Sequence, residues 1–171
     1  YTSDKKKFIA RGYFNGFSQI SFRIITRDAH DEINQAFFER RFRELLDLRK
    51  RFINTRETNA FRCVYGESDG IPGLIIDKYN EVYVFQIHTL GIEVRRTDII
   101  EAMKKVYAPK TIHERSDVGV RRHENLPDEP KGHVSGEEVA GEIEIKENGI
   151  TLLVNVVEGQ KTGMFLDQRE N

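Results

Sequence analysis

Two asparagine–glycine pairs, one toward each end of the chain, constrain the fold more than any other feature of the sequence. Asn15-Gly16 lies between the aromatic and β-branched runs FIARGYF and QISFRIIT, and Asn148-Gly149 lies between GEIEIKE and ITLLVNVV. This dipeptide favours a two-residue hairpin turn, because both of its residues tolerate positive φ. The sequence therefore predicts an antiparallel hairpin near each end. In the first hairpin, alternation predicts a half-buried face made of Ile20, Phe22 and Ile24.

Residues 33–53 have the periodicity of one long amphipathic helix. Asp31 and Asn34 are the candidates for its N-cap, and no glycine or proline interrupts it. A helix of this kind is typical of a stiff connector between two domains. The residues predicted to form its apolar face are Phe38, Phe42, Leu45, Leu46 and Phe52.

The middle of the chain has the pattern of an α+β unit. Three strand-like runs come first, at 61–67, 73–79 and 81–89. A helix is predicted over 97–107, with Thr97 as its N-cap, and another strand over 111–118. The polar stretch 123–138, which contains two prolines, is predicted to be an exposed loop. This order favours an α+β fold with an antiparallel sheet.

Charge is distributed unevenly, although the net charge is only −1. Residues 1–62 carry 14 lysines and arginines against 8 acidic residues, whereas residues 63–171 carry 13 against 20. This asymmetry favours an anionic partner for the first third of the chain. Arg11, Tyr13 and Arg23 combine basic groups with an aromatic ring and are the candidate RNA contacts. A solvated basic helix, or one that mediates dimer contacts, is the alternative.

Several classes of site are not expected. The histidine spacing and the single cysteine offer no metal centre, and no G-x-G-x-x-G or P-loop string occurs. Segment 66–70 is not expected to be a serine-hydrolase elbow. Cys63 is predicted to be a small core residue, and a lone cysteine fits a reducing, cytoplasmic compartment. No membrane association is expected, because no apolar stretch approaches the roughly 20 residues of a spanning helix.

The segment from Gln160 to Arg169 is dense in groups that form hydrogen bonds. Asp167 and Glu170 have the spacing of a capping box, which marks the start of a helix. Such a cluster before a helix suits an anionic or zwitterionic ligand, and a polar loop with a helix cap is the alternative. Because the helix signal falls at the end of the sequence, a truncated chain is expected.

Several strings, in this order, resemble a family of S-adenosylmethionine-dependent ribosomal RNA large-subunit methyltransferases. RGYFNGFSQISFRIITRD resembles the end of the family's PUA domain, with Gly12, Ser18, Gln19 and Arg23 at matching positions. YGESDGIPGLIIDKY and HERSDVGVRR resemble its central EEHEE domain. EGQKTGMFLDQREN resembles the signature at the entry to its catalytic domain, with Met164 where an aromatic residue is common.

The resemblance implies an α+β chain in four parts. These are the C-terminal part of a PUA-like β-barrel over 1–33, a helical linker over 34–56, an EEHEE α/β sandwich domain over 57–140, and the opening hairpin of a truncated Rossmann-like methyltransferase domain over 141–171.

The resemblance also implies a function. The whole enzyme would use S-adenosyl-L-methionine to methylate 23S-type ribosomal RNA, at cytosine carbon-5. This chain would be its RNA-binding adaptor portion and would contain no catalytic residue. A noncatalytic RNA-binding adaptor module is the alternative. Ribosomal RNA is the implied partner, and a homodimer stays open. The residues implied at the cofactor pocket are Thr162, Gly163, Phe165, Asp167, Gln168 and Arg169.

Overall fold

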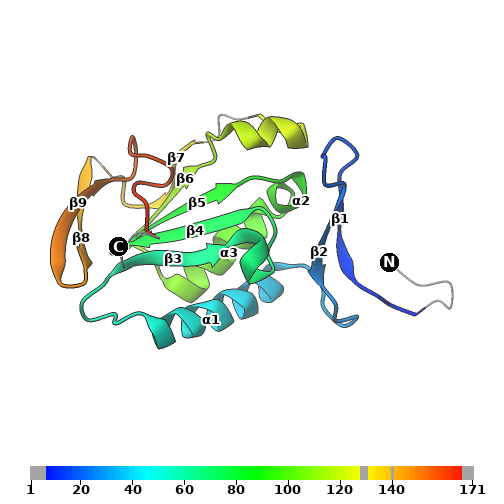
Figure 1. Cartoon of the computed structure of the whole chain (residues 1–171), viewed down its shortest axis with the longest axis horizontal. Helices are drawn as coiled ribbons and strands as arrows, with labels where there is room; N and C mark the ends of the chain where they lie inside the picture. Colours follow the sequence, from blue (N-terminus) through cyan, green and yellow to red (C-terminus); the bar gives the residue numbers. More distant parts are fainter. Residues whose placement is uncertain (1–6, 128–130, 140, 167–171) are drawn as a thin grey trace.

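The computed structural model describes residues 7–127, 131–139 and 141–166. In that part of the chain the strands form three sheets, which are a hairpin, a five-stranded central sheet and a second hairpin. Figure 1 shows the two hairpins at opposite ends of the molecule, with the central sheet and its helices between them. The mixed α+β class predicted from the sequence is confirmed.

The elements have the following bounds. The strands are β1 (Arg11–Phe14), β2 (Phe22–Thr26), β3 (Ala60–Tyr65), β4 (Leu74–Tyr79), β5 (Val82–Ile87), β6 (Thr111–Arg115), β7 (Lys131–Gly136), β8 (Glu142–Glu147) and β9 (Ile150–Asn155). The α-helices are α1 (Gln35–Phe52), α2 (Leu90–Glu93) and α3 (Arg96–Tyr107). The 3-10 turns are η1 (Gly66–Asp69) and η2 (Gly119–Glu124).

The central sheet has the strand order β3-β4-β5-β6-β7. Its pairs are antiparallel except β5–β6, which is parallel, and α3 lies in the connection between these two strands. The prediction of a loop over 123–138 is wrong, because Lys131–Gly136 pairs with β6 as strand β7. The polar sequence of β7 suits an edge strand, since such a strand is paired on one side only.

Helices α1 and α3 cover one face of the central sheet. Asn34 is the N-cap of α1, and its Oδ1 accepts a hydrogen bond of 3.1 Å from the backbone N–H of Phe37. The helix that was expected to be a connector is thus also a layer of the core. Its predicted apolar face is wrong at Phe52, which is 80% exposed, and it omits Phe37, which is buried. The other buried apolar residues of α1 are Phe38, Phe42 and Leu45.

Helix α3 begins one residue before the predicted N-cap. Thr97 lies inside its first turn, and Arg95 takes the cap position without a side-chain hydrogen bond. The prediction fails because α2 leads directly into α3. The backbone of Val94 is already helical, so the chain has no extended residue from which Thr97 could cap the helix.

The second hairpin, β8–β9, covers part of the opposite face of the central sheet. Asn148 and Gly149 have φ of 50° and 80° and connect the paired residues Glu147 and Ile150. The predicted two-residue turn is therefore confirmed. Ile145 is fully buried against a second core cluster, which includes Tyr79 of β4.

The first hairpin is present but differs from its prediction. The backbone N–H of Asn15 donates to the carbonyl of Ser21, so the turn is wider than two residues. The predicted inward face is also wrong, since Ile20 is 59% and Ile24 37% exposed. Asn15 is buried instead, because its side chain makes long-range hydrogen bonds that replace a tight turn.

Cys63 and the apolar content of the helices test two further predictions from the sequence. Cys63 is fully buried in β3, and burial raises the pKa of its thiol well above the ordinary range, so its predicted role as a core residue is confirmed. Among the helices of the described residues, none has both the length and the apolar composition to cross a membrane.

Candidate functional site

The predicted site residues fall in two places, the β1–β2 hairpin and the segment 158–166 that follows β9. These two places lie at different ends of the central sheet (Figure 1). The structure therefore does not bring the predicted RNA contacts and the described pocket residues into one site.

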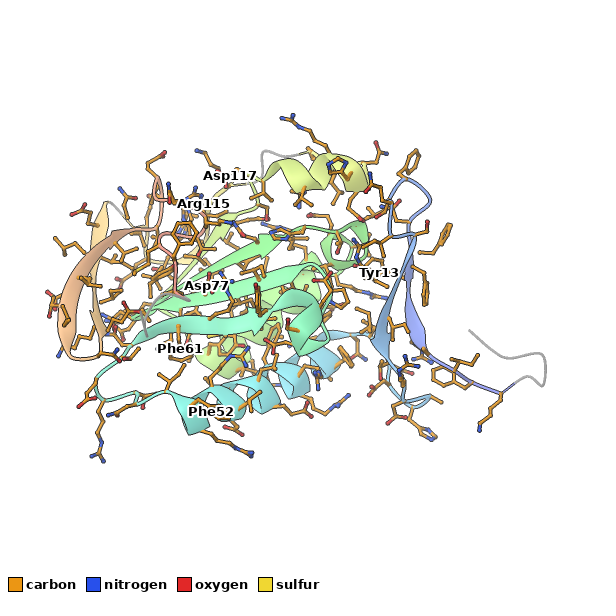
Figure 2. The ribbon with its side chains drawn as sticks, viewed as in Figure 1. Tyr13, Phe52, Phe61, Asp77, Arg115 and Asp117 are labelled. Carbon is orange, nitrogen blue, oxygen red and sulfur yellow. The ribbon has the colours of Figure 1, made fainter. Side chains whose placement is uncertain are left out.

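Tyr13 joins the first hairpin to the central unit, which is the five-stranded sheet with its helices α1, α2 and α3 and the turns η1 and η2. Its hydroxyl lies 2.8 Å from Thr89 Oγ1 and 3.1 Å from the carbonyl oxygen of Pro72. Burial raises the pKa of Tyr13 to about 12, although its hydrogen bond with Thr89 opposes the shift. A Cβ at Gly91 would lie 2.0 Å from Tyr13 Cγ, so the tyrosine ring rests on bare backbone. In Figure 2, Tyr13 extends from β1 toward the central unit.

Glu124, at the end of η2, is the second joint. It is 2% exposed and accepts hydrogen bonds from Asn15 Nδ2 at 2.9 Å, from Ser18 Oγ, and from the backbone N–H of Leu90 at 3.2 Å. Arg23 forms an ion pair of 3.1 Å with the same carboxylate. Burial alone would raise the pKa of Glu124, but these four partners outweigh it, and the pKa is lowered.

The three candidate RNA contacts have different surroundings. Tyr13 and Arg23 are cross-strand neighbours on the inner face of the hairpin and bind the central unit. Arg11 lies at the open end of the hairpin, where its Nη2 makes one long hydrogen bond of 3.4 Å to the carbonyl oxygen of Ala29. Of the three, Arg11 therefore has the side chain most available to an outside partner.

Most arginines of α1 form ion pairs within the protein. Arg40 pairs with Asp31, Arg41 with Glu44, and Arg43 with Glu39. Arg49 pairs with Asp69 of η1, and its Nε also donates to the carbonyl oxygen of Arg62. The basic excess of the first third is thus partly neutralised by the fold.

Thr162 anchors the segment 158–166 to the central sheet. It is fully buried, donates a hydrogen bond of 2.6 Å to Asp77 Oδ2, and lies 2.8 Å from the hydroxyl of Tyr79. The same carboxylate of Asp77 accepts two hydrogen bonds from Arg62, of 2.8 Å and 2.9 Å. Asp77 is itself fully buried, so its charge is met by a bidentate guanidinium and a hydroxyl. Figure 2 places Asp77 within the central sheet.

Arg115 fixes the start of the same segment. Its Nη1 donates to the carbonyl oxygens of Val156 and Gly159, at 3.2 Å and 3.0 Å. Its Nε forms an ion pair of 3.1 Å with Asp117, and Figure 2 shows these two side chains close together. Two charged residues of the central unit therefore hold the segment, Arg115 at Gly159 and Asp77 at Thr162.

The remaining predicted pocket residues differ in accessibility. Gly163 has φ of 152°, and a Cβ there would lie 2.9 Å from Val154 Cγ1, so this position requires glycine. Phe165 is 46% exposed, with Lys161 Nζ 5.7 Å from the centre of its ring. Asp167, Gln168 and Arg169, like the predicted cap at Glu170, lie outside the described residues.

Three residues of these sites, Asp77, Glu124 and Gly91, were not predicted from the sequence. Asp77 interrupts the apolar run GLIIDKY, and a charge within a buried strand indicates that a partner must exist. Glu124 and Gly91 gave no such signal, because their contacts lie across long sequence separations.

Segment 66–70 has the spacing of the serine-hydrolase string G-x-S-x-G, but its structure is different. It forms the 3-10 turn η1, not a sharp turn from a strand into an α-helix. Asp69 in this turn binds the backbone N–H of Tyr65 and pairs with Arg49. Within the described ranges, no group of three or more His, Cys, Asp or Glu residues is arranged to hold a metal ion.

The chain is similar to proteins named as ribosomal RNA methyltransferases. It is 39% identical over 168 residues to a ribosomal RNA large subunit methyltransferase I from Alteromonas mediterranea, across 98% of this chain and 42% of the relative. It is 38% identical over 165 residues to the protein of that name from Escherichia coli, across 96% of this chain and 41% of the relative. The chain thus spans about two fifths of the curated relatives it matches. No protein-family model matches the chain.

Two solved structures share its fold. One, from Streptococcus mutans and assigned to the SAM-dependent methyltransferases, superposes with a TM-score of 0.79 at 26% identity, over 99% of this chain and 42% of that one. The second, assigned as a methyltransferase and complexed with SAH, superposes with a TM-score of 0.81 at 26% identity, over 99% of this chain and 42% of that one.

Proposed function

We propose that the chain is the RNA-binding and adaptor portion of an enzyme like the ribosomal RNA large subunit methyltransferase I proteins, of which it spans about two fifths. The observation that carries this proposal is the match of 39% identity across 98% of the chain. The whole enzyme transfers a methyl group to large-subunit ribosomal RNA of the 23S type, with cytosine carbon-5 as the methylated atom.

The proposed domains follow the resemblance. Residues 1–33 end a PUA-like domain, 34–56 form the linker helix, 57–140 form the EEHEE domain, and 141–171 open the methyltransferase domain. The five strands of the central sheet and α3 supply the strand–helix–strand order that the EEHEE assignment needs. The separate placement of β1–β2 supports the first boundary.

S-Adenosylmethionine supplies the methyl group when it is bound to the whole enzyme. The described residues fit one side of such a pocket, because Phe165 offers a half-exposed aromatic wall beside Lys161. Thr162 and Gly163 hold the wall in place, since one binds Asp77 and the other permits close packing. Asp167, Gln168 and Arg169 are proposed to orient the cofactor or the target nucleotide by hydrogen bonds.

Methyl transfer by the protein expressed from its complete reading frame tests this function. The assay follows labelled methyl groups from S-adenosylmethionine into large-subunit ribosomal RNA. Arg169→Ala and Phe165→Ala should each lower the rate by about a hundredfold with little change in melting temperature, because positioning groups have effects of this size. Labelled methyl groups that never enter the RNA would favour the noncatalytic adaptor instead.

A further inference from the structure

A cleft of about 410 Å³ lies where the first hairpin meets the central unit. It is bounded by β1 and β2, by the start of α1, and by α2 with the residues that follow it. Its floor is apolar: Ile25 and Ile33 are partly exposed there, whereas Phe38 and Ile92, which also line the cleft, are buried. The volume falls in the range of small-molecule sites, which is roughly 300 to 1,000 Å³. Such sites are also lined mainly by apolar residues.

Two arginines lie at this cleft, one from the hairpin and one from the central unit. Arg11 Nη2 is 3.4 Å from its acceptor, and Arg95 Nη1 is 3.6 Å from Asp98, with a side chain that is 45% exposed. These are long contacts, in contrast to the ion pair of 2.6 Å between Arg41 and Glu44 on α1. Contacts of this length contribute little stability. Both guanidinium groups can therefore break them and turn toward an anion.

The charge balance of the cleft favours an anionic ligand. Glu32 is the one acidic residue among the described residues that line it, against Arg11 and Arg95. An apolar floor beside two guanidinium groups suits a planar base joined to a phosphate, since extruded bases pack against apolar side chains and arginine binds phosphate by two hydrogen bonds.

We propose that this cleft binds one unstacked nucleotide of the RNA, with the base against the apolar floor and a phosphate on Arg11 and Arg95. This inference rests on the proposed function and names the place where the RNA chain crosses from the hairpin to the central unit. The cleft is preorganised for this purpose. Tyr13 and Glu124 fix the hairpin against the central unit, so binding does not need to order the two parts.

The test is binding of a short, fluorescently labelled single-stranded oligoribonucleotide to the chain, measured by anisotropy at several salt concentrations. Arg11→Ala and Arg95→Ala should each weaken binding roughly fivefold at low salt and lower the slope of log K against log salt by about 1. Val94→Glu should weaken binding at least as much, because Val94 lines the cleft, is 69% exposed, and would gain a charge that repels phosphate.

Arg56→Ala is the matched control. Arg56 is exposed and follows the far end of α1, so its loss should weaken binding less than about twofold, as expected for a screened and distant charge. Melting temperatures of all four variants check that the hairpin stays docked. A free mononucleotide, added as competitor, should displace the oligonucleotide only weakly, since it lacks the neighbouring phosphates.

The outcomes separate the two proposals. If the unchanged chain binds RNA and the three cleft variants behave like Arg56→Ala, the cleft assignment is overturned while the proposed function stands. If a free mononucleotide binds the cleft and the oligonucleotide does not, RNA is the wrong source of the nucleotide. If the unchanged chain binds no RNA, the proposed function fails, and the cleft assignment fails with it.

Discussion

Asp77 and Glu124 are two buried carboxylates, each surrounded by donors from distant parts of the chain. Asp77 connects Arg62 of β3 with Thr162 of the terminal segment, residues 158–166, and Glu124 connects η2 with the first hairpin. A buried charge is tolerated only where its hydrogen bonds are satisfied. These two residues therefore determine where the outer segments dock on the central unit.

Thr162→Val should lower the free energy of unfolding by about 2 kcal/mol, because it removes a hydrogen bond to a charged group and leaves Asp77 with fewer donors. Thr162→Ser keeps the hydroxyl and should lower it less. Urea unfolding measures both changes. Equal stability of the valine variant and the unchanged chain would show that the terminal segment does not depend on Asp77.

The contribution of Glu124 should depend on pH. Its pKa is lowered in the folded protein from an ordinary value of 4.5. The stabilisation is therefore fully present above about pH 4.5 and is lost as the pH falls through the folded-state pKa. Compared with the unchanged chain, Glu124→Gln should flatten the acid limb of stability against pH. Glu142→Gln, at an exposed position on β8, serves as the control and should leave that limb in place.

For single residues, the sequence predicts part of the site and misses the rest. The residue type alone predicts the role of Cys63 as a small core residue and of Gly163 as a position of close backbone approach. Tyr13 and Arg23 look like surface contacts for RNA, yet the fold uses both to join two of its parts. Whether an arginine binds a ligand or an internal carboxylate depends on residues such as Glu124, which lie about a hundred positions away in the sequence.

At the level of elements, the contact between β1 and α2 depends on Gly91, because glycine has no side chain. Gly91 in α2 leaves room for the ring of Tyr13, and no other residue type would. This contact and the joint at Glu124 hold the hairpin against the central sheet. Figure 1 shows the hairpin at one end of that sheet.

Gly91→Ala should displace the first hairpin, because its Cβ would lie 2.0 Å from Tyr13 Cγ. We expect faster amide hydrogen exchange over 11–26 and little change over the central sheet, since a local opening exposes only the displaced segment. Gly119→Ala is the matched control, because a Cβ there meets nothing within 4 Å. Unchanged exchange over 11–26 in Gly91→Ala would mean that the ring and the backbone can separate without cost.

The elements that sequence reasoning finds are those with strong local signals. The span of α1, its Asn34 cap and the Asn148-Gly149 turn all follow from patterns within a few residues. The elements it misses depend on distant partners. Strand β7 is polar and is a strand only because β6 pairs with it, and the turn at Asn15 is widened by its bonds to Glu124.

Over the whole molecule, the terminal segment and the first hairpin are docked on opposite ends of one central unit (Figure 1). The terminal segment presents one aromatic wall at Phe165, and the buried hydroxyl of Thr162 is already bound to Asp77. We therefore expect the chain by itself to bind S-adenosylmethionine no more tightly than millimolar, since its sequence has no Gly-rich strand–loop–helix unit. Calorimetric titration checks this, and a micromolar one-to-one isotherm would contradict it.

We propose that this chain is the RNA-facing part of a ribosomal RNA methyltransferase. The most direct test is its affinity for a large-subunit ribosomal RNA fragment as salt is varied, for the unchanged chain and for Arg11→Glu beside Lys104→Glu. We expect the affinity to fall at least about tenfold between about 50 and about 200 mM salt. We also expect charge reversal at Arg11 to weaken binding more than charge reversal at Lys104 on α3. Absent binding, binding indifferent to salt, or equal effects of the two reversals would contradict this proposal.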